Sequence, residues 1–338
     1  MSGHIEGLNY ALGKPQASGT IRKAVTDFQV TEELGFELTG EGEHQWLWVE
    51  KSGANTEWVA RELSRFAGIA IKNVGYSGLK DRHAVTRQWF SLPVVDKDWQ
   101  ELVSDEFTIL QVARHQKKLK RGAHKRNQFR LMITDLVADR EELLARLEKI
   151  QVQGVPNYFG PQRFGHNENN VTKALAWCAD EIRPRSRQNQ SLWLSALRSL
   201  LFNEILSERV ATKCWAAALP GDCMMLEGSN SVFVAPTIDD EITTRIAAAD
   251  IHPTAPLWGV GGFASSDKAA ELESRVLSPY EAQCNWLEQQ KLKLSRRSCR
   301  LMAQQFEWRF VDEDRLELTF SLESGAYATA ILREIVDV

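Results

Sequence analysis

Asp81 is the residue of this chain whose neighbours best equip it for chemistry. It stands in the stretch SGLKDRHAVTRQWF, residues 77–90, between Lys80, Arg82 and His83. Opposite charge within a few ångströms favours the ionised form of a carboxylate, and that form acts as a nucleophile or a general base. From these residues alone, a catalytic carboxylate and a solvated turn with compensating charges are equally good interpretations.

A strand is the element that would position Asp81. The residues that follow it are apolar or β-branched, namely Ala84, Val85, Thr86, Trp89 and Phe90. This composition predicts a strand that runs into the core. Asp81 would then lie at a loop-to-strand boundary, where catalytic groups often sit.

A concentrated run of cations follows downstream. Residues 114–130 read RHQKKLKRGAHKRNQFR and contain eight Lys or Arg, two His and no acid, in a chain whose formal net charge is −4. A local basic stripe on an acidic body fits a docking face for a phosphate backbone, although a solubilising loop is the simpler alternative. The cations that we predict to contact RNA phosphates are Lys117, Lys118, Lys120, Arg121, Lys125 and Arg126.

Two residues inside this stripe are not cations. Asn127 could hydrogen-bond a base edge, and Phe129 could stack on a base face. Mere solubilisation needs neither, so they favour RNA binding, although Phe129 could also be an ordinary core residue of a strand.

A third segment lies near the C-terminus. Residues 315–322 alternate apolar and polar side chains, as a half-buried strand does. Gly325 permits a tight turn, and Tyr327 follows at the start of a short predicted helix that carries Ile331, Leu332 and Ile335. Tyr327 could line a pocket or cap the core.

Together these segments resemble the TruD family of tRNA pseudouridine synthases. GLKDRHAVT (78–86) resembles the family's catalytic motif G-x-K-D-[KR]-x-A-x-T, and RGAHKRNQF (121–129) resembles its G-x-x-x-x-N-x-F motif. SGAYATAILRE (324–334) resembles the C-terminal motif, and residues 21–44 resemble the N-terminal block. GVPNYFGPQRFG (154–165) resembles the start of an inserted domain that bears the family's name.

The resemblance implies roles for single residues. Asp81 would be the catalytic aspartate, and Lys80 together with Arg22 or Lys23 would supply the supporting cations. The choice between Arg22 and Lys23 stays open, because Ala24-Val25-Thr26 replaces the proline-containing run usual in the family.

The remaining site residues would contact the substrate. Phe129 would stack on the extruded uracil, and Asn127 would hydrogen-bond the uracil edge or orient Asp81. Phe28 and Tyr327 are expected to line the pocket, and His83 to be structural. Whether Asp81 attacks a carbon directly or removes a ribose proton to give a glycal is left open.

The implied fold is α+β. We expect a pseudouridine-synthase-like catalytic domain, with a mainly antiparallel sheet flanked by helices, from residues 1–152 and 300–338. Residues 153–299 would form the inserted α+β TRUD domain. A capped helix beginning near Asp139 and a strongly amphipathic helix through Leu194, Leu197, Leu201 and Ile205 are expected on either side of that boundary.

Composition agrees with a cytoplasmic enzyme. The 338 residues are 43% hydrophobic and 25% charged, without a secretory signal or a run of about twenty apolar residues. The five cysteines form no C-x-x-C pair, so we expect small buried thiols and no metal. The expected partner is tRNA, with uridine 13 of the D arm as the target that the resemblance implies. No cofactor, membrane or obligate protein partner is expected.

Two other functions fit part of the pattern. An RNA hydrolase could use Asp81 with His83, although the clustered carboxylates of a two-metal site are missing from the sequence. A non-catalytic RNA-binding or folding factor would need only the basic stripe and stacking aromatic residues.

Overall fold

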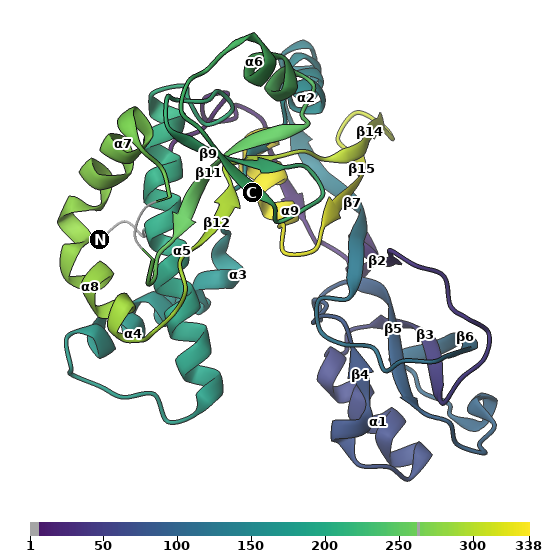
Figure 1. The fold of residues 1–338 in the computed structure, drawn as a ribbon. Coiled ribbons are helices and arrows are strands. Elements are labelled where there is room, and N and C mark those ends of the chain that lie inside the picture. Colours follow the sequence, from purple (N-terminus) through teal and green to yellow (C-terminus); the bar gives the residue numbers. More distant parts are fainter. Residues whose placement is uncertain (1–6, 262–263) are drawn as a thin grey trace. The chain divides into compact units, whose positions relative to one another are not determined.

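Two compact units make up the part of the chain that the structure describes. The computed structural model describes residues 7–261 and 264–338, so the first six residues of the expected catalytic domain lie outside it. The sheet unit comprises Gln16–Asp139, Ala303–Gly325 and Asp337–Val338. The helical unit comprises the chain up to Pro15, Arg140–Met302 and Ala326–Val336 (Figure 1).

These units group the chain differently from the expected domains. Helices α2 (Arg140–Gln153) and α9 (Ala328–Ile335) fold with the middle of the chain, because Arg146 of α2 donates hydrogen bonds to the carbonyl oxygens of Gly13 and Glu334 at 3.0 Å each. The boundaries of functional domains at 152/153 and 299/300 stay a prediction.

One large sheet forms the body of the sheet unit. Among the described residues its nine strands follow the order β14-β15-β7-β2-β5-β3-β6, with β1 beside β7 and β4 beside β5. All pairs run antiparallel except β2 with β5. The bounds are β1 (Ser18–Ile21), β2 (Phe28–Leu34), β3 (His44–Ser52), β4 (Gly75–Tyr76), β5 (Val85–Pro93), β6 (Phe107–His115), β7 (His124–Val137), β14 (Gln304–Phe310) and β15 (Leu316–Glu323). The predicted α+β class with a mainly antiparallel sheet is confirmed.

Helix α1 (Thr56–Ala67) covers part of this sheet and brings its first turn to the Asp81 loop. Its apolar stripe, which includes Val59 and Leu63, packs with Leu47 of β3 and Phe90 of β5 in one buried cluster. Thr56 then lies where its side-chain oxygen accepts a hydrogen bond from the backbone N–H of Lys80 at 3.0 Å. The same packing that buries α1 therefore positions the loop before β5.

The helical unit is built around one long helix, α5 (Arg187–Ala211). Its buried face includes Leu194, Leu197, Leu201 and Ile205, so the predicted amphipathic helix is confirmed. An antiparallel sheet in the order β10-β9-β11-β12 lies in the same unit, as does the pair β13-β8. The other elements of this unit are β8 (Val155–Pro156), α3 (Pro161–Phe164), α4 (Asn169–Cys178), β9 (Asp222–Leu226), β10 (Val232–Ala235), α6 (Asp240–Ala247), β11 (Ile251–Leu257), α7 (Asp267–Leu277), α8 (Glu281–Gln289), β12 (Ser295–Ser298) and β13 (Arg300–Leu301), with the short 3-10 helices η4 (His166–Glu168) and η5 (Ser278–Tyr280). The sheet unit contains the 3-10 helices η1 (Val25–Asp27), η2 (Ile71–Asn73) and η3 (Trp99–Glu101).

The helices and the strand predicted on either side of the middle region are also confirmed. The helix expected near Asp139 is α2, which buries Leu143, Leu147 and Ile150. The helix expected after Tyr327 is α9, and the strand expected over 315–322 is β15. Four of the five cysteines are buried and Cys178 is half-buried, all as free thiols. No helix within the described ranges is long and apolar enough to cross a bilayer.

Candidate active site

Asp81 lies in the loop between β4 and β5 of the sheet unit, as the sequence predicted. Its side chain is 32% exposed, and its two carboxylate oxygens have different partners. Oδ2 lies 2.9 Å from Nη2 of Arg22, and Oδ1 accepts a hydrogen bond from the backbone N–H of His83 at 2.9 Å. The carboxylate is thus held in one orientation while a third of the side chain stays open to solvent.

Arg22, and not Lys23, is the cation at Asp81. Arg22 adopts a left-handed backbone conformation with φ of 59°, and its guanidinium also lies 4.1 Å from the ring centre of Phe28. Lys23 instead pairs with Asp135, at 2.8 Å from Oδ1, and both residues are largely exposed. Of the two cations that the sequence left as alternatives, Arg22 is therefore the one beside Asp81.

A buried lysine holds the backbone of Asp81. Lys51, at the end of β3, is 1% exposed, and its Nζ donates to the carbonyl oxygens of Asp81 and Ala54 at 2.8 Å each. Burial lowers the pKa of Lys51 to about 8, against the opposing charge of Asp81. The Lys51 ammonium therefore holds the backbone of the Asp81 loop, whereas Arg22 and the His83 N–H hold the side-chain carboxylate.

The expected supporting cation Lys80 has another partner. Its Nζ lies 2.9 Å from Oε2 of Glu32, whose side chain is fully buried. The Ser77 hydroxyl donates to the same oxygen, and the backbone N–H of Trp89 donates to Oε1 at 3.4 Å. Lys80 therefore anchors the loop that carries Asp81, and no ion pair joins the two side chains in the part of the chain described.

Polar contacts with α1 and β5 complete the loop's anchoring. The Thr56 hydroxyl donates to Oε1 of Gln88 at 2.9 Å, and Nε2 of Gln88 donates to the carbonyl oxygen of Gly78 at 3.1 Å. Nε of Arg82 donates to the carbonyl oxygen of Gly53 at 2.8 Å. Contacts at both ends of residues 77–83 give the loop a defined shape before any substrate arrives.

Phe28 and Phe129 lie together in a row of rings. Phe28 meets Phe129 edge-on at 6.2 Å between ring centres, and Phe129 stacks on Phe320 at 5.4 Å. Phe129 of β7 is paired directly with Phe320 of β15, whereas on β2 it is paired with Val30 and Phe28 lies diagonally from it. Phe129 is only 8% exposed, so it contributes to the core as well as adjoining the Arg22–Asp81 pair through Phe28.

Asn127 lies two residues before Phe129 on β7 and contacts His124. Its Nδ2 lies 3.1 Å from Nε2 of His124. Burial, and secondarily the charge of Lys80, lower the pKa of His124, which suits a neutral ring that accepts from the amide. Oδ1 of Asn127 and Nδ1 of His124 are buried without a hydrogen-bond partner among the described residues. Such atoms are costly to leave unpaired and are candidates for pairing with a ligand.

The basic stripe forms the loop between β6 and β7, continued into β7. Its backbone is anchored to the sheet unit by three hydrogen bonds: Trp46 Nε1 to the Lys117 carbonyl oxygen at 3.0 Å, the Leu119 N–H to Ser91 Oγ at 2.8 Å, and the Gly122 N–H to the Ser77 carbonyl oxygen at 2.7 Å. The last contact joins the stripe directly to the Asp81 loop. Most of the predicted phosphate-binding cations, Lys117, Lys120, Arg121 and Lys125, are exposed, while Lys118 and Arg126 are half-buried.

Tyr327 belongs to the helical unit. It stands at the N-terminal end of α9, and its hydroxyl accepts a hydrogen bond from Nη2 of Arg163 at 2.6 Å. Its ring lies 6.1 Å from that of Phe159. Arg163 and Phe159 both come from the segment 154–165, so two of the segments that carry the family resemblance meet here.

Sequence reasoning missed Lys51 and Glu32 as functional residues. A signal for Lys51 was present, because Leu47, Val49 and Lys51 alternate along β3 and thus share its buried face. Glu32 shares a face of β2 with Phe28 and Val30 in the same way. A charged residue at a buried strand position requires a partner, although the pattern does not say which one.

The described residues contain no group of three or more His, Cys, Asp or Glu placed to hold a metal ion. The chemistry available at the site is that of an oriented carboxylate, an arginine, an amide and aromatic rings.

Comparison with known proteins agrees with this fold. The model of the family described as tRNA pseudouridine synthase D (TruD) matches residues 4–177 and 180–335. Relatives named tRNA pseudouridine synthase D include one from Nitrosococcus oceani, 46% identical with 97% of this chain and 93% of the relative covered, and one from Pseudomonas putida, 44% identical with 97% and 94% covered. A crystal structure of a Methanosarcina mazei chain described as a tRNA pseudouridine synthase D shares the fold, with a TM-score of 0.73 at 22% identity over 98% of this chain and 97% of that one.

A family match over nearly the whole length, with relatives at this level of identity, defines the class of protein. The chain belongs to the TruD family.

Proposed function

We propose that this chain isomerises uridine to pseudouridine in tRNA, with Asp81 as the essential carboxylate. The observation that carries the proposal is the Asp81 geometry: a partly exposed carboxylate is held by Arg22 and the His83 N–H, on a loop fixed by Lys51. Family membership and the names of the relatives support the reaction. As the finer target we propose uridine 13 of the D arm, and as the compartment the cytoplasm.

The reaction needs few groups. The N1–C1′ glycosidic bond breaks, the uracil turns over, and C5 bonds to C1′; C5 then loses its proton and N1 gains one. There is no net oxidation or reduction and no external group transfer, so the proposal requires no cofactor. Asp81 either attacks C1′ or removes the C2′ proton to give a glycal, and both routes use an ionised carboxylate.

The neighbouring groups have defined tasks in this proposal. Arg22 holds the Asp81 carboxylate in one orientation, and its contact with Phe28 fixes its own position. The target uridine leaves its stack to enter the site, where Phe129 replaces part of the lost stacking and Phe28 lines the pocket. The unpaired Oδ1 of Asn127 accepts from N3–H of the uracil, which gives that buried atom a partner.

The exposed cations of the stripe bring the tRNA to the site. Because the Gly122 N–H bonds to the Ser77 carbonyl oxygen, phosphates bound along the stripe lie next to the segment that carries Asp81. Their charge also speeds encounter with a polyanion on a chain that is acidic as a whole.

A test in solution uses the purified protein and an unmodified tRNA transcript. Carbodiimide derivatisation followed by primer extension detects pseudouridine, which is invisible as a mass change. One strong stop at a single uridine supports the proposal. Cleaved RNA would indicate a hydrolase, and a gel shift without any stop would indicate a binding factor.

A further inference from the structure

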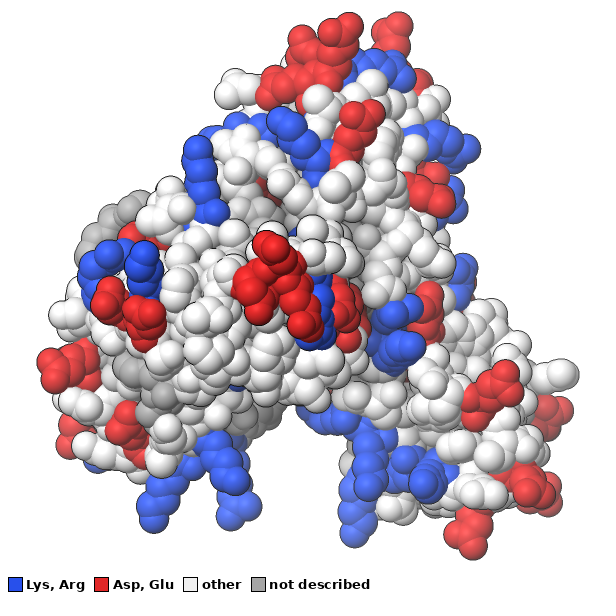
Figure 2. Space-filling model, turned by 45° about the horizontal axis from the view of Figure 1, so that its top comes forward, with Lys and Arg blue, Asp and Glu red and all other residues white. Residues whose placement is uncertain are grey.

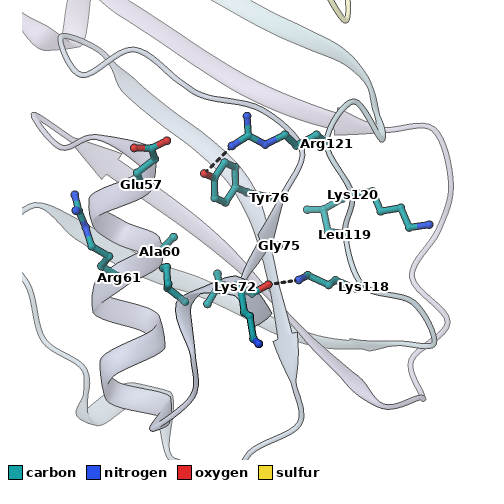
Figure 3. A pocket seen from close by; sticks show the side chains of 12 residues that line it. Glu57, Ala60, Arg61, Lys72, Gly75, Tyr76, Lys118, Leu119, Lys120 and Arg121 are labelled. Atoms are coloured by element: carbon teal, nitrogen blue, oxygen red, sulfur yellow. Dashed lines mark hydrogen bonds between the residues drawn. The ribbon is translucent and has the colours of Figure 1, made fainter. Parts of the chain in front are cut away.

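A pocket on the sheet unit lies outside the Asp81 site. It has a volume of about 680 Å³ and is bordered by α1, by the segment from Ile71 to Tyr76 and by stripe residues 118–121 (Figure 3). Pockets of roughly 300–1,000 Å³ are typical of sites for small ligands. Asp81 is not among the residues that line it.

Most of the charged side chains that line the pocket are positive. Five lining residues are cations, whereas Glu57 is the one lining carboxylate. Figure 2 shows Lys and Arg side chains gathered along one side of the lobe that carries β3, β5 and β6, with acidic side chains on its other side. The cations that line the pocket are Arg61, Lys72, Lys118, Lys120 and Arg121. Such a rim fits a phosphate-bearing ligand.

The pocket also has an aromatic and apolar part. Tyr76 is half-buried, with its ring centre 5.4 Å from the guanidinium carbon of Arg121, and Arg121 Nη2 donates to its hydroxyl at 3.3 Å. Ala60, Val74 and Leu119 are buried lining residues. Figure 3 shows the Tyr76 ring beside Arg121 at one end, with Lys72 and Lys118 toward the other. A flat surface of this kind suits a base, which a bare anion would not require.

The pocket wall is fixed by close packing at Gly75. A Cβ atom at this position would lie closer to the Leu119 carbonyl oxygen and the Ser91 hydroxyl than atoms normally approach. Lys118 Nζ also donates to the carbonyl oxygen of Lys72 at 2.6 Å, which ties the stripe to the opposite wall. The pocket is therefore formed before any ligand binds.

We propose that this pocket binds an unstacked nucleotide of the tRNA other than the target uridine. Its base lies against Tyr76 and the apolar floor, and its phosphates lie against the cationic rim. The inference rests on the proposed function, since it takes tRNA as the substrate. Ser77, next to Tyr76, begins the anchored loop of Asp81, so a nucleotide held here sets the register of the RNA relative to the catalytic carboxylate.

Two sets of variants separate the base from the phosphates. Tyr76→Leu keeps apolar bulk but removes the ring, and Tyr76→Phe keeps the ring. Arg61→Ala with Lys72→Ala removes two exposed cations that lie outside the basic stripe. Lys149→Ala with Lys268→Ala, two exposed lysines of the helical unit, serves as the matched control.

Binding of the unmodified tRNA transcript is measured over a series of salt concentrations. We expect Tyr76→Leu to weaken binding about tenfold with an unchanged salt slope, and Tyr76→Phe to stay near the wild type. The Arg61→Ala/Lys72→Ala pair should make the slope shallower by up to about two units, whereas the control pair should not. Wild-type affinity and slope in the cation pair, whose exposed side chains are dispensable for folding, would overturn the proposal. Wild-type affinity in folded Tyr76→Leu would mean that the pocket acts only through its charge. This result would also overturn the proposal.

Pseudouridine formation separates this inference from the proposed function. The pocket variants should raise KM and leave kcat at saturating tRNA near the wild-type value, because Asp81 and its partners are intact. Absence of pseudouridine with the wild-type protein contradicts the proposed function itself. Normal pseudouridine formation with an unchanged KM in every pocket variant contradicts only the inference about the pocket.

Discussion

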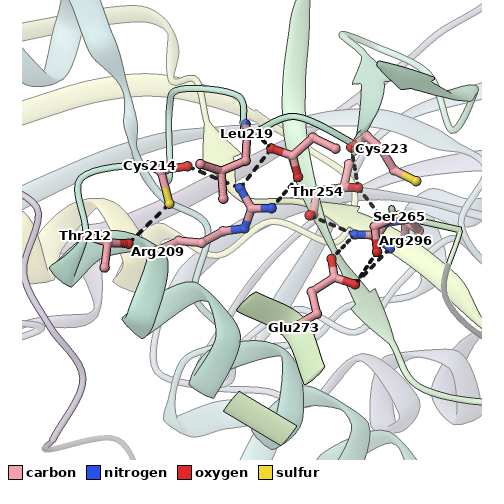
Figure 4. Close-up of polar contacts among 10 residues, drawn as sticks. Arg209, Thr212, Cys214, Leu219, Cys223, Thr254, Ser265, Glu273 and Arg296 are labelled. Carbon is pink, nitrogen blue, oxygen red and sulfur yellow. Dashed lines mark hydrogen bonds and ion pairs between the residues drawn. The ribbon is translucent and has the colours of Figure 1, made fainter. Parts of the chain in front are cut away.

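Two aspartate–arginine pairs, Asp222–Arg209 of the helical unit and Asp81–Arg22 of the sheet unit, differ in their surroundings. In the helical unit, Asp222 and Arg209 are both fully buried, and the Asp222 carboxylate bonds to both terminal nitrogens of Arg209 and to the Leu219 N–H (Figure 4). In the sheet unit, Asp81 and Arg22 form a pair in which about a third of each side chain is exposed.

The difference shows what a carboxylate–guanidinium pair needs in order to act on a substrate. The oxygens of Asp222 are enclosed, and a second buried pair, Arg296 with Glu273, belongs to a separate set of polar contacts around Thr254 (Figure 4). Asp81 is held as firmly through its loop, but its carboxylate has an open side. On β7 of the same unit, the buried Oδ1 of Asn127 lacks a hydrogen-bond partner among the described residues. An oriented carboxylate with room beside it indicates a reaction site, whereas a saturated one indicates structure.

The largest expected effect comes from Asp81→Asn. The substitution keeps the shape of the side chain and removes the charge, so turnover should fall about a thousandfold, with tRNA affinity kept or slightly raised. The melting temperature should stay close to that of the wild type because the side chain is partly exposed. Single-turnover kinetics measure the loss; a decrease of less than about tenfold, roughly 1.4 kcal/mol in barrier, would reduce Asp81 to an orienting group.

The matched substitution Asp222→Asn should have the opposite profile. It leaves Arg209 buried without its counter-charge, which costs roughly 3–5 kcal/mol of the free energy of unfolding. Turnover per folded molecule should remain normal. Urea denaturation monitored by fluorescence gives the stability. Full stability together with lost turnover would contradict the assignment of the Asp222–Arg209 pair to structure.

Substitution of Phe129 should affect both turnover and the free energy of unfolding. Since Phe129 is 8% exposed and stacked on Phe320, Phe129→Ala should lower the free energy of unfolding by about 3 kcal/mol as well as lowering turnover. Phe129→Leu keeps most of the core volume but removes the ring, so it separates the roles. We expect this variant to fold and to lose at least about tenfold in turnover. Normal kinetics in Phe129→Leu would assign the residue to the core alone.

The smallest effect concerns Lys51 and pH. Its folded pKa of about 8 lies below the usual lysine value, so between pH 8 and that value the unfolded chain binds more protons than the folded one. The buried charge therefore costs stability at neutral pH, and the free energy of unfolding rises as the pH increases through 8. In Lys51→Met this rise should disappear.

Turnover tests whether Lys51 positions Asp81. Lys51→Met removes the donor to the Asp81 carbonyl oxygen, so we expect kcat to fall about tenfold or more with little change in KM. A variant with unchanged kcat, or a wild-type protein without the rise in stability above pH 8, would argue against an ammonium that fixes the loop.

Local sequence patterns predicted several elements of both units. The strand after Asp81, the strand β15 and the helix α9 each follow from alternating or helical spacing of apolar residues, which is a local property. The motifs also indicated Asp81 itself. These features needed no knowledge of which segments meet in space.

Features that depend on distant contacts could not be predicted in this way. The choice between Arg22 and Lys23 depends on the left-handed backbone at Arg22, and the burial of Phe129 depends on Phe320, far along the chain. Lys80 was expected beside Asp81, but the buried Glu32 on a separate strand takes its ammonium. The grouping of α2 and α9 with the middle of the chain likewise rests on bonds from Arg146 to remote carbonyl oxygens.

The central claim is that this chain forms pseudouridine in tRNA by means of Asp81. The most direct measurement maps pseudouridine in total tRNA from a strain that lacks the gene, complemented with either the wild type or Asp81→Asn. We expect one carbodiimide-dependent stop in the D arm, at uridine 13, that returns with the wild type and stays absent with Asp81→Asn. Restoration of the same stop by Asp81→Asn, or its absence with the wild-type protein, would contradict the account.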